Sequence, residues 1–243
     1  MPDKDTLLVI PAYNEEECLP RVLEGARPYA DRMDVLVVDD GSTDGTARVA
    51  RAGGARCLSL PFNLGIGGAL ETGFKAAYRA GYRFVVRMDA DGQHEAADVP
   101  AVLGPVERDE ADFVSGSRFG VAGNAAATNA PRRLGIALLS ALVSRLAGRA
   151  VRDPTSGFAA FNRKALAALL DEVPTDFPEV EGVLYLHRRG LRLQEVPVRF
   201  HPRGGGRSSI TFWRSLYYMY KVTFALLVLT VREVPGSAAR RLP

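Results

Sequence analysis

The stretch "RFVVRMDADGQHE", residues 83–95, predicts both a part of the fold and a part of the functional site. Its first half is a short apolar run that contains β-branched valines, which indicates a buried strand. Asp89 and Asp91 follow that run directly and lie one residue apart. Three roles fit such a pair: an acidic turn, a calcium-binding loop, or a divalent-metal site that holds a phosphate.

Similar apolar runs recur along the chain and alternate with segments that have helical periodicity. Strands are expected at 6–10, 34–40, 56–60, 83–89 and 112–117, and helices at 15–26, 42–54, 67–81 and 96–109. Beyond residue 120 we expect a loop at 122–133, a helix at 132–149, a turn, strand and helix within 153–170, a helix at 179–190 and a strand at 191–200. This alternation predicts an α/β fold with a mostly parallel central sheet and helices on both faces.

Composition and length favour an ordinary enzyme-sized domain. The chain has 243 residues, of which 47% are hydrophobic and 24% charged, and its net charge of +3 is too small to indicate nucleic-acid binding. Cys18 and Cys57 form neither a metal-binding spacing nor a disulfide framework, which is typical of a reducing cytoplasm. Residues 1–16 contain no apolar segment of the length that a secretory signal needs, so we expect a cytoplasmic location.

Polar, acidic or glycine-rich segments follow all five of the first predicted strands. They are "PAYNEE" (11–16), "DDGSTDG" (39–45), "PFNLGIGG" (61–68), "DADGQH" (89–94) and "GSRFG" (116–120). Open parallel sheets bind their ligands outside the carboxyl ends of the strands. The five segments therefore predict one long site along one edge of the sheet.

Known ion-binding and nucleotide-binding motifs narrow the chemistry of this site. A calcium loop that started at Asp89 fails at three positions: Gln93 stands where an aspartate or asparagine is required, His94 where a glycine is required, and Pro100 where a glutamate is required. A dinucleotide-binding loop at 65–70 fails because Leu70 replaces a small residue, and a Walker phosphate loop is absent.

These tests leave two roles for the aspartates, a plain acidic turn and a metal site that holds a phosphate. Mg²⁺ and Mn²⁺ prefer oxygen ligands and readily keep substrate phosphates in their coordination shell. Asp89, Asp91 and the amide oxygen of Gln93 alternate along the chain and could face one ion. His94 is expected to be a packing residue and not a ligand.

Five motifs in this order resemble glycosyltransferase family 2. They are "VIPAYNEE" (9–16), "VVDDGSTDGT" (37–46), "NLGIGGAL" (63–70), "RMDADGQH" (87–94) and "DPTSGF" (153–158). The chain is most similar to the dolichol- or polyprenol-phosphate sugar transferase branch, over roughly residues 5–210. The resemblance implies a GT-A fold, a nucleotide-diphosphate-sugar donor (a GDP- or UDP-sugar), a divalent metal (Mg²⁺ or Mn²⁺) and inversion at the anomeric carbon.

The same resemblance implies a set of donor-binding residues. The base and ribose would contact Pro11, Tyr13, Glu15, Asp39 and Asp40, and the loop beneath the nucleotide would include Asn63, Gly67 and Gly68. The metal and diphosphate would be held by Asp89, Asp91 and Gln93. Arg203 and Arg207 of "HPRGGGRSS" (201–209) would close over the diphosphate. Helix capping remains an equal alternative for Asp40, and a glycine turn with a helix start for 63–68. A solvated surface loop is the alternative for 201–209.

The acceptor decides which further residues take part in the reaction. A lipid phosphate is already ionised at pH 7, so the site would need arginines and no general base; the candidates are Arg118, Arg132 and Arg133, joined through the resemblance by Ser156. A sugar hydroxyl would need a carboxylate as base, and the candidates are Asp153, Glu179 and Glu181. We expect Asp91, Arg118 and Asp153 to form the catalytic set, and the sequence favours the phosphate acceptor.

The C-terminal part, 211–243, is expected to be a separate helix and tail after a catalytic domain at 1–210. Its apolar run at 216–231 has 16 residues, fewer than the roughly 20 that span a bilayer, and cations and aromatic residues flank it. This pattern predicts an amphipathic helix on the inner face of the cell membrane, with core packing or a dimer contact as the alternatives. A membrane-protein partner and a second copy of the chain are further candidate partners.

Overall fold

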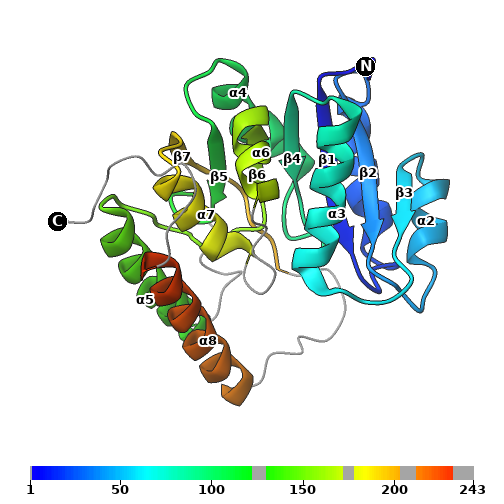
Figure 1. Ribbon diagram of the computed structural model, residues 1–243. Helices are drawn as coiled ribbons and strands as arrows, with labels where there is room; N and C mark the ends of the chain where they lie inside the picture. The colour runs from blue at the N-terminus through cyan, green and yellow to red at the C-terminus, as the bar shows by residue number, and fades with distance from the viewer. Residues whose placement is uncertain (1, 122–129, 172–177, 203–211, 232–243) are drawn as a thin grey trace.

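A seven-stranded sheet forms the centre of the computed structural model, which describes residues 2–121, 130–171, 178–202 and 212–231 (Figure 1). The strand order across the sheet is β3-β2-β1-β4-β6-β5-β7. The strands are β1 (Thr6–Ala12), β2 (Met33–Asp39), β3 (Arg56–Ser59), β4 (Phe84–Arg87), β5 (Phe113–Ser117), β6 (Ala159–Asn162) and β7 (Leu193–Pro197).

The sheet is mostly parallel, which confirms the prediction. Strand β1 pairs in parallel with both β2 and β4, and the β1–β2 register runs from Thr6 opposite Met33 to Ala12 opposite Asp39. Within the described part of the chain, β6 is the one antiparallel strand, and it pairs with β4 and β5. The carboxyl ends of β1, β2 and β4 therefore lie side by side at one edge.

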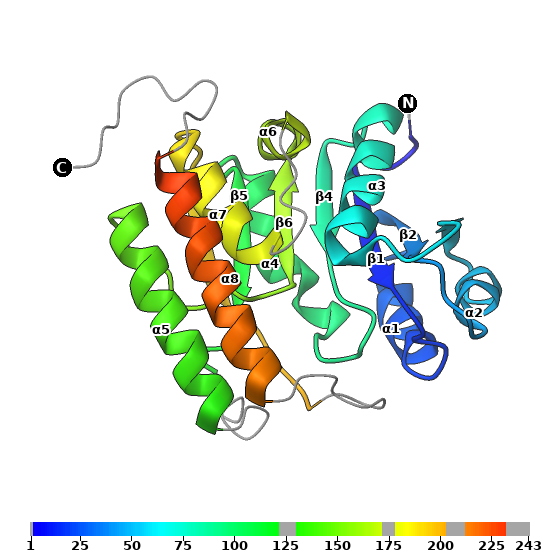
Figure 2. The same cartoon turned by 60° about the horizontal axis from the view of Figure 1, so that its bottom comes forward.

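Helices cover both faces of the sheet (Figures 1 and 2). The helices are α1 (Leu19–Ala26), α2 (Thr46–Ala52), α3 (Gly65–Ala80), α4 (Val99–Glu107), α5 (Ala130–Ala147), α6 (Arg163–Asp171), α7 (Pro178–Arg188) and α8 (Phe212–Val231), with short 3₁₀ turns at Arg27–Tyr29 and Ala96–Asp98. Successive strand residues point to opposite faces. Accordingly Leu7 and Val9 belong to a core shared with α3, α6 and α7, whereas Leu8 and Ile10 belong to a core shared with α1 and α4.

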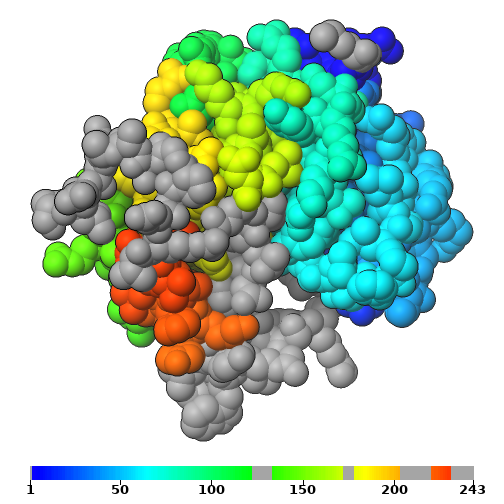
Figure 3. Space-filling view, viewed as in Figure 1, coloured from blue at the N-terminus to red at the C-terminus, as the bar shows by residue number. Residues whose placement is uncertain are grey.

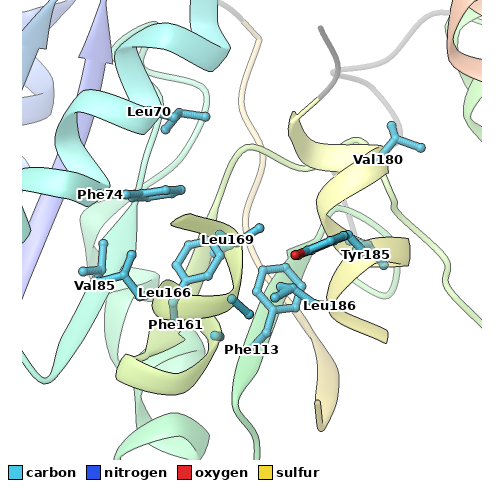
Figure 4. Packing of buried hydrophobic residues seen from close by; sticks show 14 of the residues in the cluster. Leu70, Phe74, Val85, Phe113, Phe161, Leu166, Leu169, Val180, Tyr185 and Leu186 are labelled. Carbon is cyan, nitrogen blue, oxygen red and sulfur yellow. The ribbon is translucent and has the colours of Figure 1, made fainter. Parts of the chain in front are cut away.

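Aromatic rings fill the first of these cores. Phe161 of β6 lies between Phe74 of α3 and Phe113 of β5, with ring centroids 5.2 and 5.1 Å apart. Figure 4 shows these rings between α3 on one side and α7, with Tyr185, on the other. The packing holds α3 and α7 on the same face of the sheet, with α3 over β1 and β2 and α7 toward β7. Both helices contribute residues to the site described below.

Helix α1 begins at Leu19, four residues later than the expected start at residue 15. Pro20 stands in its first turn, where a residue without an N–H group loses no hydrogen bond. Residues 13–18 are thereby released from the helix and form the loop after β1. Helix α3 differs in the opposite sense, because it begins at Gly65 and not at residue 67.

Over residues 220–230, where the structure describes its side chains, helix α8 packs against α5 and α7 along one side. Val222, Leu226 and Leu229 are buried in the same core as the sheet residues. Tyr220 and Phe224, by contrast, are 67% and 60% exposed, and α8 forms part of the molecular surface in Figure 3. Core packing and an exposed apolar face thus coexist in this helix. The division into units at residue 210 stays a prediction.

None of the helices in the described ranges is both long and apolar enough to cross a membrane.

Candidate active site

A cleft of about 300 Å³ opens at the carboxyl ends of β1, β2 and β4. Its lining comes from four of the five predicted polar segments and from β4, α3 and α7: Pro11, Ala12, Tyr13, Glu15, Asp40, Asn63, Gly65, Ile66, Ala69, Arg87, Asp89, Ala90, Asp91 and Glu179. The fifth segment, after β5, does not line it. Seven of the residues predicted to bind the donor or the metal therefore share one cavity: Pro11, Tyr13, Glu15, Asp40, Asn63, Asp89 and Asp91.

The loops after β1 and β2 are fastened to each other by hydrogen bonds. Asn14, whose φ is +53°, accepts a bond from the Thr43 backbone N–H through Oδ1 at 2.8 Å and donates its own N–H to Ser42 Oγ at 2.9 Å. The Glu15 N–H donates to Thr46 Oγ1 at 2.9 Å. These bonds hold the loop that carries cleft residues 13 and 15 in place.

Asp40 caps helix α3. Its Oδ1 accepts the Leu64 N–H at 2.8 Å and its Oδ2 accepts the Gly65 N–H at 2.9 Å. Burial raises the pKa of Asp40, although these two bonds act in the opposite direction. Asp39 is buried beneath the cleft, where its Oδ1 accepts the Ser42 N–H at 3.0 Å. Capping, the alternative that the sequence left open, is thus present for Asp40, which also lines the cleft.

Asp89 and Asp91 both line the cleft, as the motif predicted. Asp89 Oδ1 accepts a bond from Arg87 Nη2 at 3.2 Å. The backbone of Gly157 lies so close that a Cβ there would come within 2.0 Å of Asp89 Oδ2, so only glycine fits. Asp91 Oδ1 accepts the Gln93 N–H at 3.0 Å. The turn and the 153–158 segment together fix both carboxylates.

Gln93 and His94 are directed away from the cleft. Gln93 Nε2 donates to the His201 carbonyl at 3.2 Å, and the His201 N–H donates to the Gln93 carbonyl at 2.8 Å. The positive φ of Gly92, +73°, breaks the alternation on which the predicted metal role of Gln93 depended. His94 packs between Phe158 and Phe200, and burial lowers its pKa to about 4. It is a neutral packing residue. Metal binding by Gln93 stays a prediction.

The two carboxylates fit a divalent metal of the magnesium type. Within the ranges that the structure describes, no group of three or more His, Cys, Asp or Glu side chains could hold an ion without further ligands. Mg²⁺ is usually bound through one or two carboxylates together with waters and substrate phosphates. Asp89 and Asp91, open to the cleft, match that arrangement, in which a diphosphate completes the coordination.

Arg118 and Asp153 form a buried ion pair outside the cleft. Arg118 Nε donates to Asp153 Oδ2 at 2.7 Å, and the Arg118 backbone N–H donates to the same oxygen at 3.0 Å. The guanidinium also donates to the Thr155 carbonyl at 3.2 Å and lies over the Phe200 ring. Asp153 is fully buried. The pair ties the 153–158 segment to the end of β5. The predicted catalytic roles of both residues stay predictions.

The remaining predicted residues fall into different places. Arg133 is exposed on α5, and Ser156 is buried with its Oγ accepting the Phe158 N–H at 3.3 Å. Gly68 lies within the first turn of α3 and does not line the cleft. The side chain of Arg132 and the whole of Arg203 and Arg207 lie outside the described residues.

Arg87 is a cleft residue that the sequence did not identify. Its guanidinium bonds to Asp89 and to Glu179, and its side chain is only 5% exposed. Burial alone would disfavour the charged form, but Glu179 and Asp89 raise the pKa of Arg87 above its usual value. The signal in the sequence that could have identified it is a charged residue, Arg87, at the end of an otherwise apolar strand.

A model of the family described as "Glycosyl transferase family 2" matches residues 7–170. The chain belongs to this family. It is a glycosyltransferase, and its curated relatives place it in the polyprenol-phosphate branch. Within that branch it is similar to the undecaprenyl-phosphate mannosyltransferase of Micrococcus luteus, with 35% identity over 84% of this chain and 87% of the relative.

Two other relatives agree with this assignment, and a solved structure shares the fold. The polyprenol monophosphomannose synthase of Mycolicibacterium smegmatis is 31% identical over 91% of this chain and 86% of its own length. The UDP-N-acetylglucosamine–dolichyl-phosphate N-acetylglucosaminyltransferase of Methanococcus voltae is 30% identical over 82% and 86%. Glucosyl-3-phosphoglycerate synthase of Mycobacterium tuberculosis superposes with a TM-score of 0.69 at 24% identity, covering 93% of this chain and 79% of that one. This likeness shows the GT-A fold.

Proposed function

We propose that this glycosyltransferase moves a sugar from a nucleotide-diphosphate sugar, GDP- or UDP-linked, to a polyprenyl phosphate, with inversion at the anomeric carbon. The observation that carries the proposal is the cleft in which Asp89 and Asp91 lie beside Tyr13, Asp40 and Asn63. Its volume of about 300 Å³ is at the lower end of typical ligand sites.

In this proposal the donor lies across the strand ends. Its base and ribose contact the loops after β1 and β2, where Tyr13 is 46% exposed and offers a ring to the base. Asp89 and Asp91 hold Mg²⁺ or Mn²⁺ at the diphosphate. The bound metal supplies charge neutralisation for the departing diphosphate. Arg87 and Gly157 keep Asp89 at the correct position.

Two observations favour a phosphate acceptor over a hydroxyl acceptor. The three relatives are named for transfer to, or synthesis of, lipid phosphates. Two of the three candidate bases are also held by arginines: Asp153 is fully buried with Arg118, and Glu179 is paired with Arg87. A phosphate that is ionised at pH 7 needs no base. Transfer to a saccharide or small-molecule hydroxyl remains the alternative, in polysaccharide or glycoconjugate synthesis for the cell envelope.

A lipid acceptor also requires contact with a membrane. The exposed apolar side of α8, with Phe224, Leu227 and Val228, is the surface that we assign to the cytoplasmic leaflet, where the protein would be peripheral. A membrane protein or a second copy of the chain could share that surface.

The experiment is a donor screen with and without a divalent metal. Purified enzyme is incubated with radiolabelled UDP- or GDP-sugars, undecaprenyl phosphate, and Mg²⁺, Mn²⁺ or EDTA. We expect label in the lipid phase with one donor, only when metal is present. Asp91→Asn, which retains the size of the side chain, should abolish transfer with an unchanged melting temperature. Metal-independent transfer by that variant would contradict the assigned site.

A further inference from the structure

Arg87 and Glu179 form a buried ion pair at the wall of the cleft, and the donor-binding roles assigned so far give Glu179 no function. Arg87 ends β4, and Glu179 lies in the first turn of α7. Arg87 Nη2 donates to Glu179 Oε1, and their side chains are 5% and 17% exposed. Among the described residues, Arg87 Nε has no hydrogen-bond partner.

The position of the pair follows from the order of the strands. The nucleotide residues lie after β2 and β1 and at the start of α3, and Asp89 and Asp91 lie after β4. Beyond β4 the sheet continues with β6, and α7 lies on that side, opposite α3 (Figure 4). A donor whose diphosphate lies at Asp89 and Asp91 therefore directs its sugar toward α7. Glu179 is the α7 residue that lines the cleft.

The chemistry of the pair suits the recognition of a sugar. Sugar hydroxyl groups are hydrogen-bond donors, and an ionised carboxylate offers about four acceptor positions. Among the described residues, the hydrogen bond from Arg87 reaches Oε1 of Glu179, so the other oxygen can accept from a ligand. A site built around such a bond rejects analogues in which the hydroxyl is absent or misplaced, because a polar group is then left buried without a partner.

We propose that Glu179 is a specificity-determining residue that binds hydroxyl groups of the donor sugar, and that Arg87 is its positioning residue. Arg87 orients the carboxylate through its hydrogen bond, and through its second bond, to Asp89, it connects the sugar site to the diphosphate site. This inference rests on the proposed function, because it requires a nucleotide-sugar donor in the cleft.

The test compares the affinity for nucleotides with and without a sugar. Titration calorimetry in Mn²⁺ measures the Kd of UDP, GDP, UDP-glucose, UDP-galactose, UDP-N-acetylglucosamine and GDP-mannose for wild-type enzyme and for Glu179→Gln. The Gln variant keeps the shape of the side chain. Glu110→Gln is the matched control, because Glu110 also pairs with an arginine, Arg108, but is exposed and does not line the cleft.

We expect Glu179→Gln to raise the Kd of the bound nucleotide sugar about tenfold, the loss typical of a hydrogen bond to a charged group. The Kd of the same nucleotide without its sugar should stay within about twofold, and discrimination between epimeric donors should fall. Glu179→Asp keeps the charge beside Arg87 but shortens the side chain, so it should show the same loss and provides the comparison if the Gln variant unfolds.

Three results would overturn the inference. If Glu179→Gln weakens the nucleotide and the nucleotide sugar by the same factor, Glu179 acts only through Asp89. If neither affinity changes, Glu179 does not contact the donor. If wild-type enzyme binds none of the nucleotides, the proposed function fails as well, and this outcome is distinct from the first two because the control and wild-type proteins fail together.

Discussion

Substitution of Gly157 tests whether the position of Asp89 is essential. In Gly157→Ala the new Cβ would lie 2.0 Å from Asp89 Oδ2 and 2.6 Å from its Cγ, whereas real Cβ contacts stay above 3.0 Å. The carboxylate must therefore move by about 1 Å. The backbone of Gly157 does not have a positive φ, so alanine introduces no backbone strain there. Overpacking of this kind costs about 1–3 kcal/mol of stability.

We expect Gly157→Ala to lose metal and donor binding while it stays folded. A displacement of about 1 Å in a reacting site reduces turnover on the order of a hundredfold. Titration of Mn²⁺ by electron paramagnetic resonance measures the metal, and circular dichroism measures the fold. Gly25→Ala is the control, since its Cβ would meet Ala96 Cβ at an ordinary 3.7 Å. If Gly157→Ala binds Mn²⁺ and turns over as the wild type does, Asp89 does not act from the position seen in the structure.

Three further predictions concern stability and the surface. Arg192 lowers the pKa of Asp112 from 3.8 to about 2 through hydrogen bonds, so ionised Asp112 adds about 2 kcal/mol to the free energy of unfolding. This contribution is present above pH 4 and is lost as the pH falls toward 2. Chemical denaturation should show that the difference in free energy of unfolding between wild type and Asp112→Asn shrinks over that range. Asp40→Asn replaces one of the two oxygens that accept from the Leu64 and Gly65 N–H groups with an amide NH2, while Gly65 keeps Asn63 Oδ1 as a second acceptor. The free energy of unfolding should therefore fall by about 1 kcal/mol, which equilibrium urea unfolding would measure. Phe224→Gln should lower the fraction of protein that sediments with anionic vesicles, whereas Leu58→Gln, also at an exposed apolar residue, should leave that fraction unchanged. Equal vesicle binding by both variants would refute a role for α8.

Local patterns carried most of the fold and half of the site. The apolar runs identified β1, β2, β4 and β5, because a strand buried in a sheet is recognised by its run of apolar residues. The polar residues after these strands converge because the carboxyl ends of parallel strands share an edge. The order of the strands and the antiparallel direction of β6 depend on packing between distant segments, such as Phe74 with Phe161. No local pattern specifies those contacts.

The parts of the site that the sequence did not specify have the same origin. Glu179 meets Arg87 across 92 residues, so neither residue indicates the other. The buried ion pair of Asp153 with Arg118, which follows β5, joins residues 35 positions apart. The sequence also did not specify the contact of Gln93 with the His201 backbone, because His201 follows 108 residues later in the chain.

The most direct test of the proposed activity is a competition between two acceptors that differ only in their head group. Equal amounts of undecaprenyl phosphate and undecaprenol are added to the enzyme with metal and the donor found by screening. Mass spectrometry then identifies the lipid products. Our account predicts a single product, a sugar joined to undecaprenyl phosphate through a phosphodiester. A glycosylated undecaprenol as the main product would contradict it.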